Sequence, residues 1–336
     1  MVQLMEKTRT FGRTGSINVP AKIRVIGVGG GGCNSVRRMM EAEQVLGVAY
    51  VAANTDIKSL ESVDNCDVVQ IGEGVTHGFG AGGDPSVGAR AAEESRYSLK
   101  RAISGAELIF ITVGMGGGTG TGAAPAVARL ARETKALTIA VVTTPFGFEG
   151  AKRLDQAMAG IARLRPEVDN LIIVHNDRLL RLMTEDASME EAFKTADSVV
   201  TQGILSISKL VNMPGEINVD LADCKAVLHI PGAALMAMGE GQGPKCAVDA
   251  AEQAIANPLL DFSMQGAKGV LFNIEGGPDL KLGQVNEAGK LISSQADKSA
   301  RIFFGFMKPR EELSGKARIT LVATGMRQNV PKNNHH

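Results

Sequence analysis

The sequence is poor in the residue types that bind nucleic acids. Its 336 residues include no tryptophan and two tyrosines, which argues against an aromatic platform for stacking bases. Lysine and arginine together number 36, and so do aspartate and glutamate, so the formal net charge at pH 7 is zero. This balance provides neither a basic surface for nucleic acid nor an acidic tail. We therefore expect no nucleic-acid partner.

Long apolar runs and paired cysteines are also missing. No run approaches the roughly 20 apolar residues that cross a bilayer, so we expect no direct insertion into a membrane. The four cysteines are far apart, at Cys33, Cys66, Cys224 and Cys246. They form no C-x-x-C motif, which disfavours a disulfide framework and a zinc site. Residues 1–16 lack the apolar core of a signal peptide. Together these absences favour a cytoplasmic location.

What the sequence does contain is an alternation of short apolar runs with helical patterns. The runs are rich in β-branched residues and almost continuously apolar, as strands are when a sheet is covered on both faces. They comprise residues 23–28, 47–54, 67–72, 108–114, 137–144 and 171–176. Helical patterns lie between several of them, for instance at 85–103 and 123–133. This alternation predicts an α/β fold with a Rossmann-like, doubly wound sheet.

One long amphipathic helix interrupts this rhythm at 188–212. Ser188 and Glu191 have the spacing of a capping box at its start, and Pro214 with Gly215 ends it. Its apolar side chains recur at three and four residues, at Ala192, Phe193, Ala196, Val199, Val200, Gly203, Ile204, Ile207, Leu210 and Val211. We expect this apolar stripe to be buried between two α/β domains.

The last third of the chain predicts a second, smaller α/β domain. Its strand-like runs are at 225–230, 269–274, 301–306 and 318–323, and its helical stretches are near 246–256 and 283–296. The expected organisation is a disordered segment at 1–20, a first domain at 21–187, a central helix at 188–213, a C-terminal domain at 214–327 and a disordered tail at 328–336.

Two glycine-rich stretches each follow a strand-like run and precede a helix. The first, GVGGGGCNS at 27–35, would let backbone N–H groups converge on an anion, usually a phosphate. Gly27, Gly29 and Gly32 also satisfy the dinucleotide fingerprint G-x-G-x-x-G. Asp56 is then a loose candidate for the acid that a dehydrogenase places on the ribose. A tight turn without any ligand is a third interpretation.

The second stretch, GGGTGTG at 116–122, favours a polyphosphate over a dinucleotide. A dehydrogenase needs one such stretch, whereas two on neighbouring strand ends suggest a polyphosphate held from two sides. Thr119 and Thr121 add hydroxyl groups that suit a phosphate or an oxygen bound to magnesium. No G-x-x-x-x-G-K-[ST] motif is present, which excludes the P-loop class.

Seven motifs, taken in order, resemble the tubulin and FtsZ superfamily, and within it the bacterial form. They are GVGGGGCN at 27–34, NTD at 54–56, GAGGDP at 80–85, GMGGGTGTGAAP at 114–125, PFGFEG at 145–150, ND at 176–177 and NVDLAD at 218–223. The resemblance covers nearly all of residues 22–326. It implies a GTPase that polymerises into the scaffold of the bacterial division ring, with its GTP-binding domain at 21–187.

The resemblance also implies a set of residues for the nucleotide. The phosphates would lie against Gly30, Gly31, Gly32, Cys33, Asn34, Gly116, Gly117, Gly118, Thr119 and Gly120. Glu149 and Arg153 would hold the ribose side, and Asn176 belongs to the same set. Phe193 would stack on guanine, while Asp197 would accept from its N1–H and N2 amine and so reject adenine. Without the family, Glu149 with Arg153 could be an exposed helix pair, and Phe193 a core residue.

The acidic segment after the long helix carries Asn218, Asp220 and Asp223, which are the candidate catalytic residues. They could polarise a water or hold a cation; the alternative is a solvated turn with a helix cap. Asn218 lies 21 positions after Asp197, roughly 30 Å if both were on one helix axis. The acidic segment would therefore reach only the γ-phosphate of a second molecule, stacked head to tail in an open filament.

Ligands and partners follow from this interpretation. GTP and GDP are the expected ligands, with Mg²⁺ bridging the phosphates and a monovalent cation as a further candidate, although no metal-binding residues are assigned. The chain itself is the expected partner, at the division site, and division proteins would join if a longer protein carries a C-terminal tail. Two alternatives stay open: a nicotinamide-dependent dehydrogenase, and a nucleotide-binding scaffold that assembles but barely hydrolyses.

Overall fold

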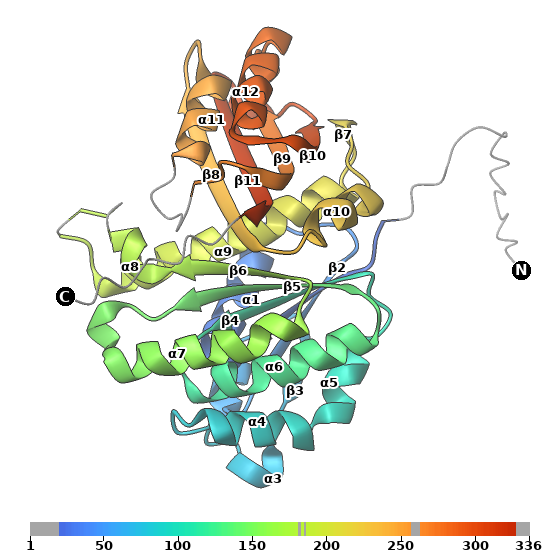
Figure 1. Cartoon of the computed structure of the whole chain (residues 1–336). Coiled ribbons are helices and arrows are strands. Elements are labelled where there is room, and N and C mark those ends of the chain that lie inside the picture. Colours follow the sequence, from blue (N-terminus) through green and yellow to red (C-terminus); the bar gives the residue numbers. More distant parts are fainter. Residues whose placement is uncertain (1–19, 181–182, 185, 257–262, 327–336) are drawn as a thin grey trace, which may run out of the picture.

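Two α/β units are joined by one long helix. The computed structural model describes residues 20–180, 183–184, 186–256 and 263–326. Figure 1 shows helix α9 (Met189–Asn212) running between a larger unit of sheet and helices and a smaller one. This arrangement confirms the predicted α/β class. The segments expected to be disordered, 1–20 and 328–336, lie outside the described residues except for Pro20.

The larger unit is built on six parallel strands in the order β3-β2-β1-β4-β5-β6. The strands are β1 (Ile23–Val28), β2 (Val48–Asn54), β3 (Asp67–Gln70), β4 (Leu108–Gly114), β5 (Leu137–Thr144) and β6 (Asn170–His175). The chain moves outward from β1 through β2 to β3 and then returns to place β4 on the other side of β1. Open α/β sheets bind ligands at such a reversal, beyond the carboxyl ends of the two central strands.

Helices cover both faces of this sheet, which explains the almost continuous apolar runs. They are α1 (Gly29–Ala42), α2 (Ile57–Glu61), α3 (Glu73–Thr76), α4 (Pro85–Glu94), α5 (Arg96–Ile103), α6 (Gly118–Glu133), α7 (Ala151–Leu164) and α8 (Asn176–Leu179), with 3-10 turns η1 (Gly147–Glu149) and η2 (Arg165–Glu167). Neighbouring residues of β1 enter different cores. Val25 joins the core that includes α1 and α9, whereas Ile26 joins the core that includes α4 to α7.

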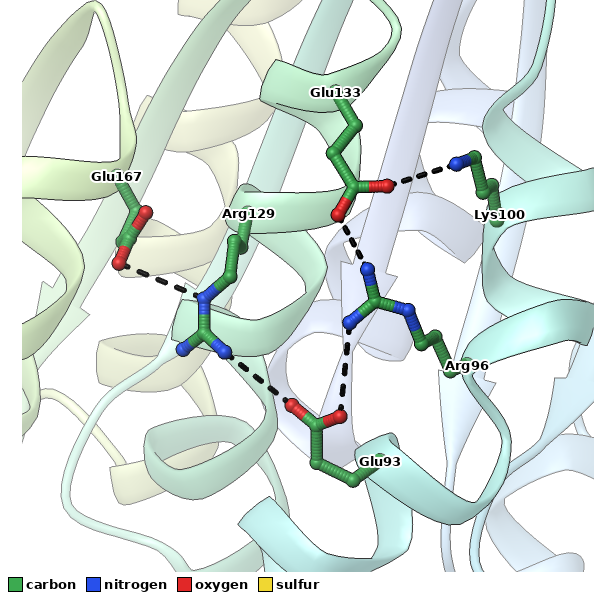
Figure 2. A network of polar contacts seen from close by, with 6 residues as sticks. All are labelled: Glu93, Arg96, Lys100, Arg129, Glu133 and Glu167. Carbon is green, nitrogen blue, oxygen red and sulfur yellow. Dashed lines mark hydrogen bonds and ion pairs between the residues drawn. The ribbon is translucent and has the colours of Figure 1, made fainter.

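Charged side chains tie several of these helices together at the surface. Figure 2 shows ion pairs that link α4, α5, α6 and η2 through Glu93, Arg96, Lys100, Arg129, Glu133 and Glu167. Lys100 Nζ lies 2.8 Å from Glu133 Oε2, and Arg129 Nη1 lies 3.4 Å from Glu93 Oε1. Exposed pairs of this kind each contribute little to stability. The network links neighbouring helices at the surface, and it contains none of the predicted site residues.

Helix α9 has the predicted start and the predicted burial. Ser188 accepts a hydrogen bond from Glu191 N at 3.2 Å, and Glu191 Oε2 accepts one from Ser188 N at 2.7 Å, which completes the capping box. Ile204, Ile207 and Leu210 are buried in a core that also contains strand residues of both units. The expected stripe is therefore buried between the two α/β units over most of its length, but Phe193 is 39% exposed, and Val199 and Val211 are half-buried.

The smaller unit continues the sheet with mixed pairing. Its strands are β7 (Gly215–Ile217), β8 (Ala233–Gln242), β9 (Ala267–Gly276), β10 (Ala296–Met307) and β11 (Lys316–Met326), and its helices are α10 (Leu221–Leu228), α11 (Cys246–Ile255) and α12 (Leu282–Gln295). The strand order is β8-β11-β9-β10-β7, with β11 antiparallel to both of its neighbours. One pair, Ile172 with Ala234, joins β6 to β8 and so links the two units.

Four local expectations are corrected. The run 225–230 is largely helical, because Asp220 and Asp223 cap α10 and its buried residues recur at helical spacing. Strand β8 was not expected, since Ala, Met and Gly are weak strand formers; antiparallel pairing with β11 imposes it. The pattern 85–103 forms two helices that meet at Ser95. Helix α6 begins at Gly118, five residues before the expected 123.

Candidate functional site

The two glycine-rich stretches are mostly first turns of helices rather than loops. Helix α1 starts at Gly29, directly after β1, and α6 starts at Gly118, four residues after β4. Because β1 and β4 are paired neighbours, the two helix N-termini lie at the same edge of the sheet. Neither N-terminus is capped by a side chain, and neither has an acidic residue in its first turn. Both therefore present free N–H groups and positive dipole ends to an anion.

The glycines allow the two helix starts to approach each other closely. Gly29 has φ +73°, and a Cβ there would lie 2.7 Å from Gly120 N. Gly31 faces Gly114 in the same way, since a Cβ on Gly31 would lie 3.2 Å from Gly114 Cα. By contrast, a Cβ on Gly30 or Gly117 would meet nothing within 4 Å. The backbone is thus tightly packed where the two helix starts meet, at Gly29 and Gly31, and open at Gly30 and Gly117. We call this arrangement the cradle, because a ligand would lie on its open side.

Residues of the second stretch mainly shape this cradle. Gly116 has φ +100°, and a Cβ there would lie 2.8 Å from Arg153 O, so this position requires glycine. Thr121 Oγ1 accepts a hydrogen bond from Gly116 N at 2.8 Å and is fully buried, so it fixes the turn instead of facing a phosphate. Thr119 Oγ1 lies 2.6 Å from Thr55 Oγ1. Of the two predicted hydroxyl donors, Thr119 alone remains a candidate.

In the first stretch, solvent exposure separates the ligand candidates from the core residues. Gly30, Gly31 and Asn34 are exposed, whereas Gly32 and Cys33 are buried. The Cys33 thiol lies 3.9 Å from Gly27 O and 3.8 Å from Ala53 O, against the sheet. Burial raises its pKa to about 12, so the thiol stays neutral. Cys33 can therefore serve a ligand only through its backbone N–H.

Asp197 is held by α1 through both of its carboxylate oxygens. Ser35 Oγ lies 3.3 Å from Asp197 Oδ1, and Arg38 Nε lies 3.2 Å from Asp197 Oδ2. Burial raises the pKa of Asp197 above its usual range, while Arg38, Ser35 and the charge of Arg37 oppose that rise. Sequence reasoning missed Ser35 and Arg38. Their position, one and four residues beyond Asn34, was the available signal.

Three phenylalanines cluster where α9 meets the end of β5. Phe193 packs edge-on against Phe146 and Phe148, with ring centroids 5.2 and 6.4 Å apart. Phe146 and Phe148 stack on each other at 5.0 Å. Phe193 is 39% exposed, so it is neither a core residue nor free of contacts. The cluster offers an aromatic surface on which a planar base could lie.

Three more of the predicted site residues follow the carboxyl ends of β5 and β6, namely Glu149 in η1, Arg153 in α7 and Asn176 in α8. Glu149 Oε1 accepts from Phe146 N at 2.9 Å, and its other oxygen pairs with Arg153 Nη1 at 2.6 Å. Asn176 begins α8 directly after β6, is buried, and has an amide oxygen without a hydrogen-bond partner. A buried polar atom of this kind is costly unless a ligand, water or rearrangement satisfies it.

The acidic residues lie at the other end of α9, as Figure 1 shows from the positions of α8, β7 and α10. Asp220 Oδ1 accepts from Asp223 N at 2.8 Å, and Asp223 Oδ2 accepts from Asp220 N at 3.3 Å. The pair is therefore a helix cap, with Asp223 inside α10 rather than in a loop. A cavity of about 400 Å³ borders Asn218, both aspartates and Glu107.

The geometry of α9 also corrects the distance expected from sequence. The helix ends at Asn212, fifteen residues after Asp197, so the two lie about 22 Å apart along its axis. Asn212 accepts from Ala21 N at 2.9 Å and donates to Ala21 O at 2.9 Å, which ties this end of α9 to the start of β1. The acidic segment is thus at the amino ends of the strands, opposite the cradle.

A metal site built from protein side chains and a dehydrogenase-type ribose contact find little support in the described ranges. No group of three or more His, Cys, Asp or Glu residues there could hold a metal ion. Asp56, the candidate ribose acid of a dehydrogenase, caps α2 by accepting from Lys58 N and Ser59 Oγ at 3.1 and 2.7 Å. None of the helices in these ranges is long and apolar enough to cross a membrane.

Comparisons with known proteins agree with this geometry. The family model "Tubulin/FtsZ family, GTPase domain" matches residues 22–184, and "FtsZ family, C-terminal domain" matches residues 232–327. An FtsZ dimer from M. jannaschii is 40% identical, with a TM-score of 0.87 over 92% of this chain and 89% of that chain. A mutant of the same FtsZ is also 40% identical, with a TM-score of 0.87 over 91% and 92%.

A more distant solved structure shares the fold. It is CetZ2 from Haloferax volcanii, 23% identical, with a TM-score of 0.77 over 91% of this chain and 94% of that chain. Family membership is shown by two family models that together span most of the chain and by relatives at 40% identity. The chain belongs to the Tubulin/FtsZ family and is a polymerising GTPase.

Proposed function

We propose that the cradle between α1 and α6 holds the phosphates of GTP. The observation that carries this proposal is the meeting of two uncapped, glycine-built helix N-termini at paired strand ends. The phosphate ligands would be backbone N–H groups of Gly30, Gly31, Gly32, Cys33 and Gly117, with the Asn34 side chain beside them. Gly116, Gly118 and Gly120 would act by letting the two helix starts pack closely.

The base and ribose would lie between α1, α9 and η1. Asp197 would accept from the N1–H and N2 amine of guanine, and Phe193 would offer its ring to the base. Glu149 and Arg153 would hold the ribose side, because their side chains pair with each other and the Arg153 backbone lies next to Gly116 of the second glycine stretch. The unpartnered amide oxygen of Asn176 supports a polar contact there.

A magnesium ion would fit this site only if the phosphates of the nucleotide supplied some of its ligands. Mg²⁺ usually keeps several waters and takes one or two protein oxygens beside substrate phosphates, which is compatible with a site that lacks an acidic cluster in the described ranges. Candidate oxygens beside the cradle are those of Thr119, within the second glycine stretch, and of Asp84, whose backbone N would lie 2.8 Å from a Cβ on Gly118. Bound there, the ion would neutralise phosphate charge. A monovalent cation is a further candidate.

Hydrolysis, we propose, occurs between two molecules. The acidic segment is separated from the molecule's own cradle by the length of α9, so Asn218, Asp220 and Asp223 would act on the GTP of a head-to-tail neighbour. Each aspartate uses one oxygen in the helix cap and keeps the other for a water. The adjoining cavity leaves room for that water. Asn218 would position it, and the carboxylates would orient or deprotonate it.

The cellular role that fits these properties is the scaffold of the bacterial division ring in the cytoplasm. Head-to-tail contacts that do not close build open filaments, as such a scaffold requires. The domain division at 21–187, 188–213 and 214–327 suits this role, because it puts the GTP cradle and the acidic segment at opposite ends of the central helix. Division proteins would be further partners through a longer C-terminal tail.

Calorimetric titration with GTP and ATP tests the nucleotide assignment. Recognition by Asp197 predicts at least tenfold tighter binding of GTP, a difference of about 1.4 kcal/mol. Asp197→Ala should relax that preference, and Thr119→Arg should abolish binding by filling the cradle. Equal binding of GTP and ATP by the unaltered protein would overturn the assignment of Asp197 to the base.

A further inference from the structure

We propose that Ser35 is a positioning residue that ties the base-reading carboxylate of Asp197 to the phosphate-binding helix α1. The proposal rests on the function proposed above, in which Asp197 reads guanine. It adds a residue that touches neither base nor phosphate and acts through Asp197. Its consequence is that base selection depends on a buried hydroxyl outside the glycine-rich cradle.

Ser35 stands where the two parts of the site meet. It lies in the second turn of α1 and is 3% exposed. Its Oγ is 3.2 Å from Gly31 O, one turn back on the same helix, and 3.3 Å from Asp197 Oδ1 on α9. Gly31 belongs to the exposed side of the cradle. One hydroxyl therefore contacts both the phosphate-binding turn and the base-reading side chain.

A hydroxyl group has a single proton to donate, so the two acceptors compete for it. In an α-helix, the Gly31 carbonyl already accepts from the backbone N–H of Ser35. The Asp197 carboxylate is charged and makes the stronger hydrogen bond. We therefore assign the proton to Asp197 Oδ1, with the Gly31 carbonyl as an alternative acceptor.

Arg38 makes the second contact that this arrangement needs. Its Nε lies 3.2 Å from Asp197 Oδ2, an ion pair without hydrogen-bond geometry, so Ser35 hydrogen-bonds one oxygen and the Arg38 charge attracts the other. The hydrogen bond is directional and the ion pair is less so, which makes Ser35 the main restraint on rotation of the carboxylate. A restrained carboxylate directs its remaining lone pairs toward the two donors on the guanine edge. Loss of Ser35 should then weaken base selection and leave triphosphate binding unchanged.

The experiment compares the ratio of Kd for ATP to Kd for GTP among variants of the full chain. For Ser35→Ala we expect the ratio to fall about fivefold or more, as for a lost hydrogen bond to a charged group, with the Kd for ATP within about twofold. Ser35→Thr keeps the hydroxyl and should keep the ratio. Ser208→Ala is the matched control, because Ser208 Oγ is also buried and donates to the carbonyl one turn back, Ile204 O, at 2.7 Å.

Each outcome decides the proposal. If Ser35→Ala weakens GTP and ATP equally, Ser35 merely supports the cradle and the inference is wrong. If the ratio is unchanged, the inference is also wrong. Should Ser35→Ala fold poorly, Ser35→Cys has a similar shape with a much weaker donor, and its ratio should fall as well.

A double mutant separates this inference from the proposed function. In an Asp197→Ala background, Ser35→Ala should change the ratio no further, because Ser35 acts through that carboxylate. If Asp197→Ala alone leaves the ratio intact, the assignment of Asp197 to guanine fails. If Asp197→Ala lowers the ratio and Ser35→Ala does not, the proposed function stands and only the role of Ser35 fails.

Discussion

Asp197 combines burial with two contacts from another helix. Burial alone raises the pKa of such a carboxylate and favours its protonated form, which accepts fewer hydrogen bonds. Arg38 and Ser35, together with the charge of Arg37, work against that effect, yet the pKa of Asp197 remains above its usual range. In the proposed site, recognition of guanine would therefore depend on a carboxylate whose ionised form is less favoured than that of an exposed aspartate.

This balance predicts a pH dependence of GTP binding. As the pH falls through the raised pKa of Asp197, the carboxylate takes up a proton and loses acceptor capacity, so GTP affinity should fall while ATP affinity stays nearly constant. Arg38→Met removes the largest opposing charge and should move the midpoint for GTP to higher pH. Arg301→Met, at an exposed position in β10, is the control. Identical midpoints for Arg38→Met and the unaltered protein would contradict this account.

At the scale of elements, α1 and α9 connect the proposed nucleotide site to the rest of the molecule. Helix α1 begins in the cradle at Gly29 and is followed by Glu43, whose carboxylate pairs with Lys209 of α9 and lies 3.1 Å from Arg310 Nη2 of the smaller unit. Lys209 is 7% exposed, so its charge depends on this partner. Glu43 thus joins three parts of the structure.

Glu43→Gln should destabilise the protein, because it leaves the buried Lys209 ammonium without a counterion. We expect a loss of about 1–3 kcal/mol, less than for a fully buried pair since Glu43 is partly exposed. Although burial opposes it, pairing with Lys209 and Arg310 holds the pKa of Glu43 below its usual range. Its contribution is therefore present above the usual pKa of glutamate and is lost as the pH falls through the lowered value.

Urea unfolding of Glu43→Gln at neutral and acidic pH measures this effect. Glu41→Gln, at an exposed position two residues earlier on α1, is the matched control and should unfold like the unaltered protein. The difference between the two variants should shrink on acidification. A difference that is absent at neutral pH would show that the pairing contributes nothing.

The buried stripe of α9 gives a second prediction at this scale. Ile204 is fully buried in the core shared by both units. Ile204→Asp places an unpaired charge there and should cost several kcal/mol, a lowering of Tm that thermal unfolding will detect. Gln202→Asp introduces the same residue at an exposed position of the same helix and should change Tm little. If both variants melt alike, the stripe does not stabilise the junction.

The sequence predicts these elements where local rules and burial agree. The parallel strands and α9 follow from apolar runs, helical spacing and the Ser188 cap. Strand β8 does not, because its pairing partner β11 lies more than seventy residues away in the chain. Glycine motifs and the family resemblance indicate the cradle. Ser35 and Arg38 escape prediction, because their importance depends on the distance to Asp197 on another helix.

At the scale of the whole molecule, the proposed GTP cradle and the acidic segment lie at opposite ends of α9. On the proposed mechanism, such a molecule would carry half of a hydrolytic site at each end. Stacking two copies head to tail would complete one site and leave two half sites free, so growth can continue. In such a filament, assembly would activate hydrolysis, and hydrolysis would limit assembly.

Asp223→Asn tests the role of the acidic segment while preserving the fold. The amide keeps an oxygen that can accept in the helix cap with Asp220, but it removes the carboxylate charge. We expect GTP binding to be unchanged, filaments to form and last longer in sedimentation assays, and the GTPase rate to fall at least tenfold, as for loss of a general base. An unchanged rate would remove Asp223 from the mechanism.

The GTPase rate per molecule, measured against protein concentration, tests hydrolysis between molecules most directly. A site completed by a neighbour requires contact, so the specific activity should be near zero below a threshold concentration and rise steeply above it. The same threshold should appear for sedimentation of filaments in GTP. A specific activity that stays constant on dilution to nanomolar protein would mean that each chain hydrolyses GTP alone, and would contradict the central claim.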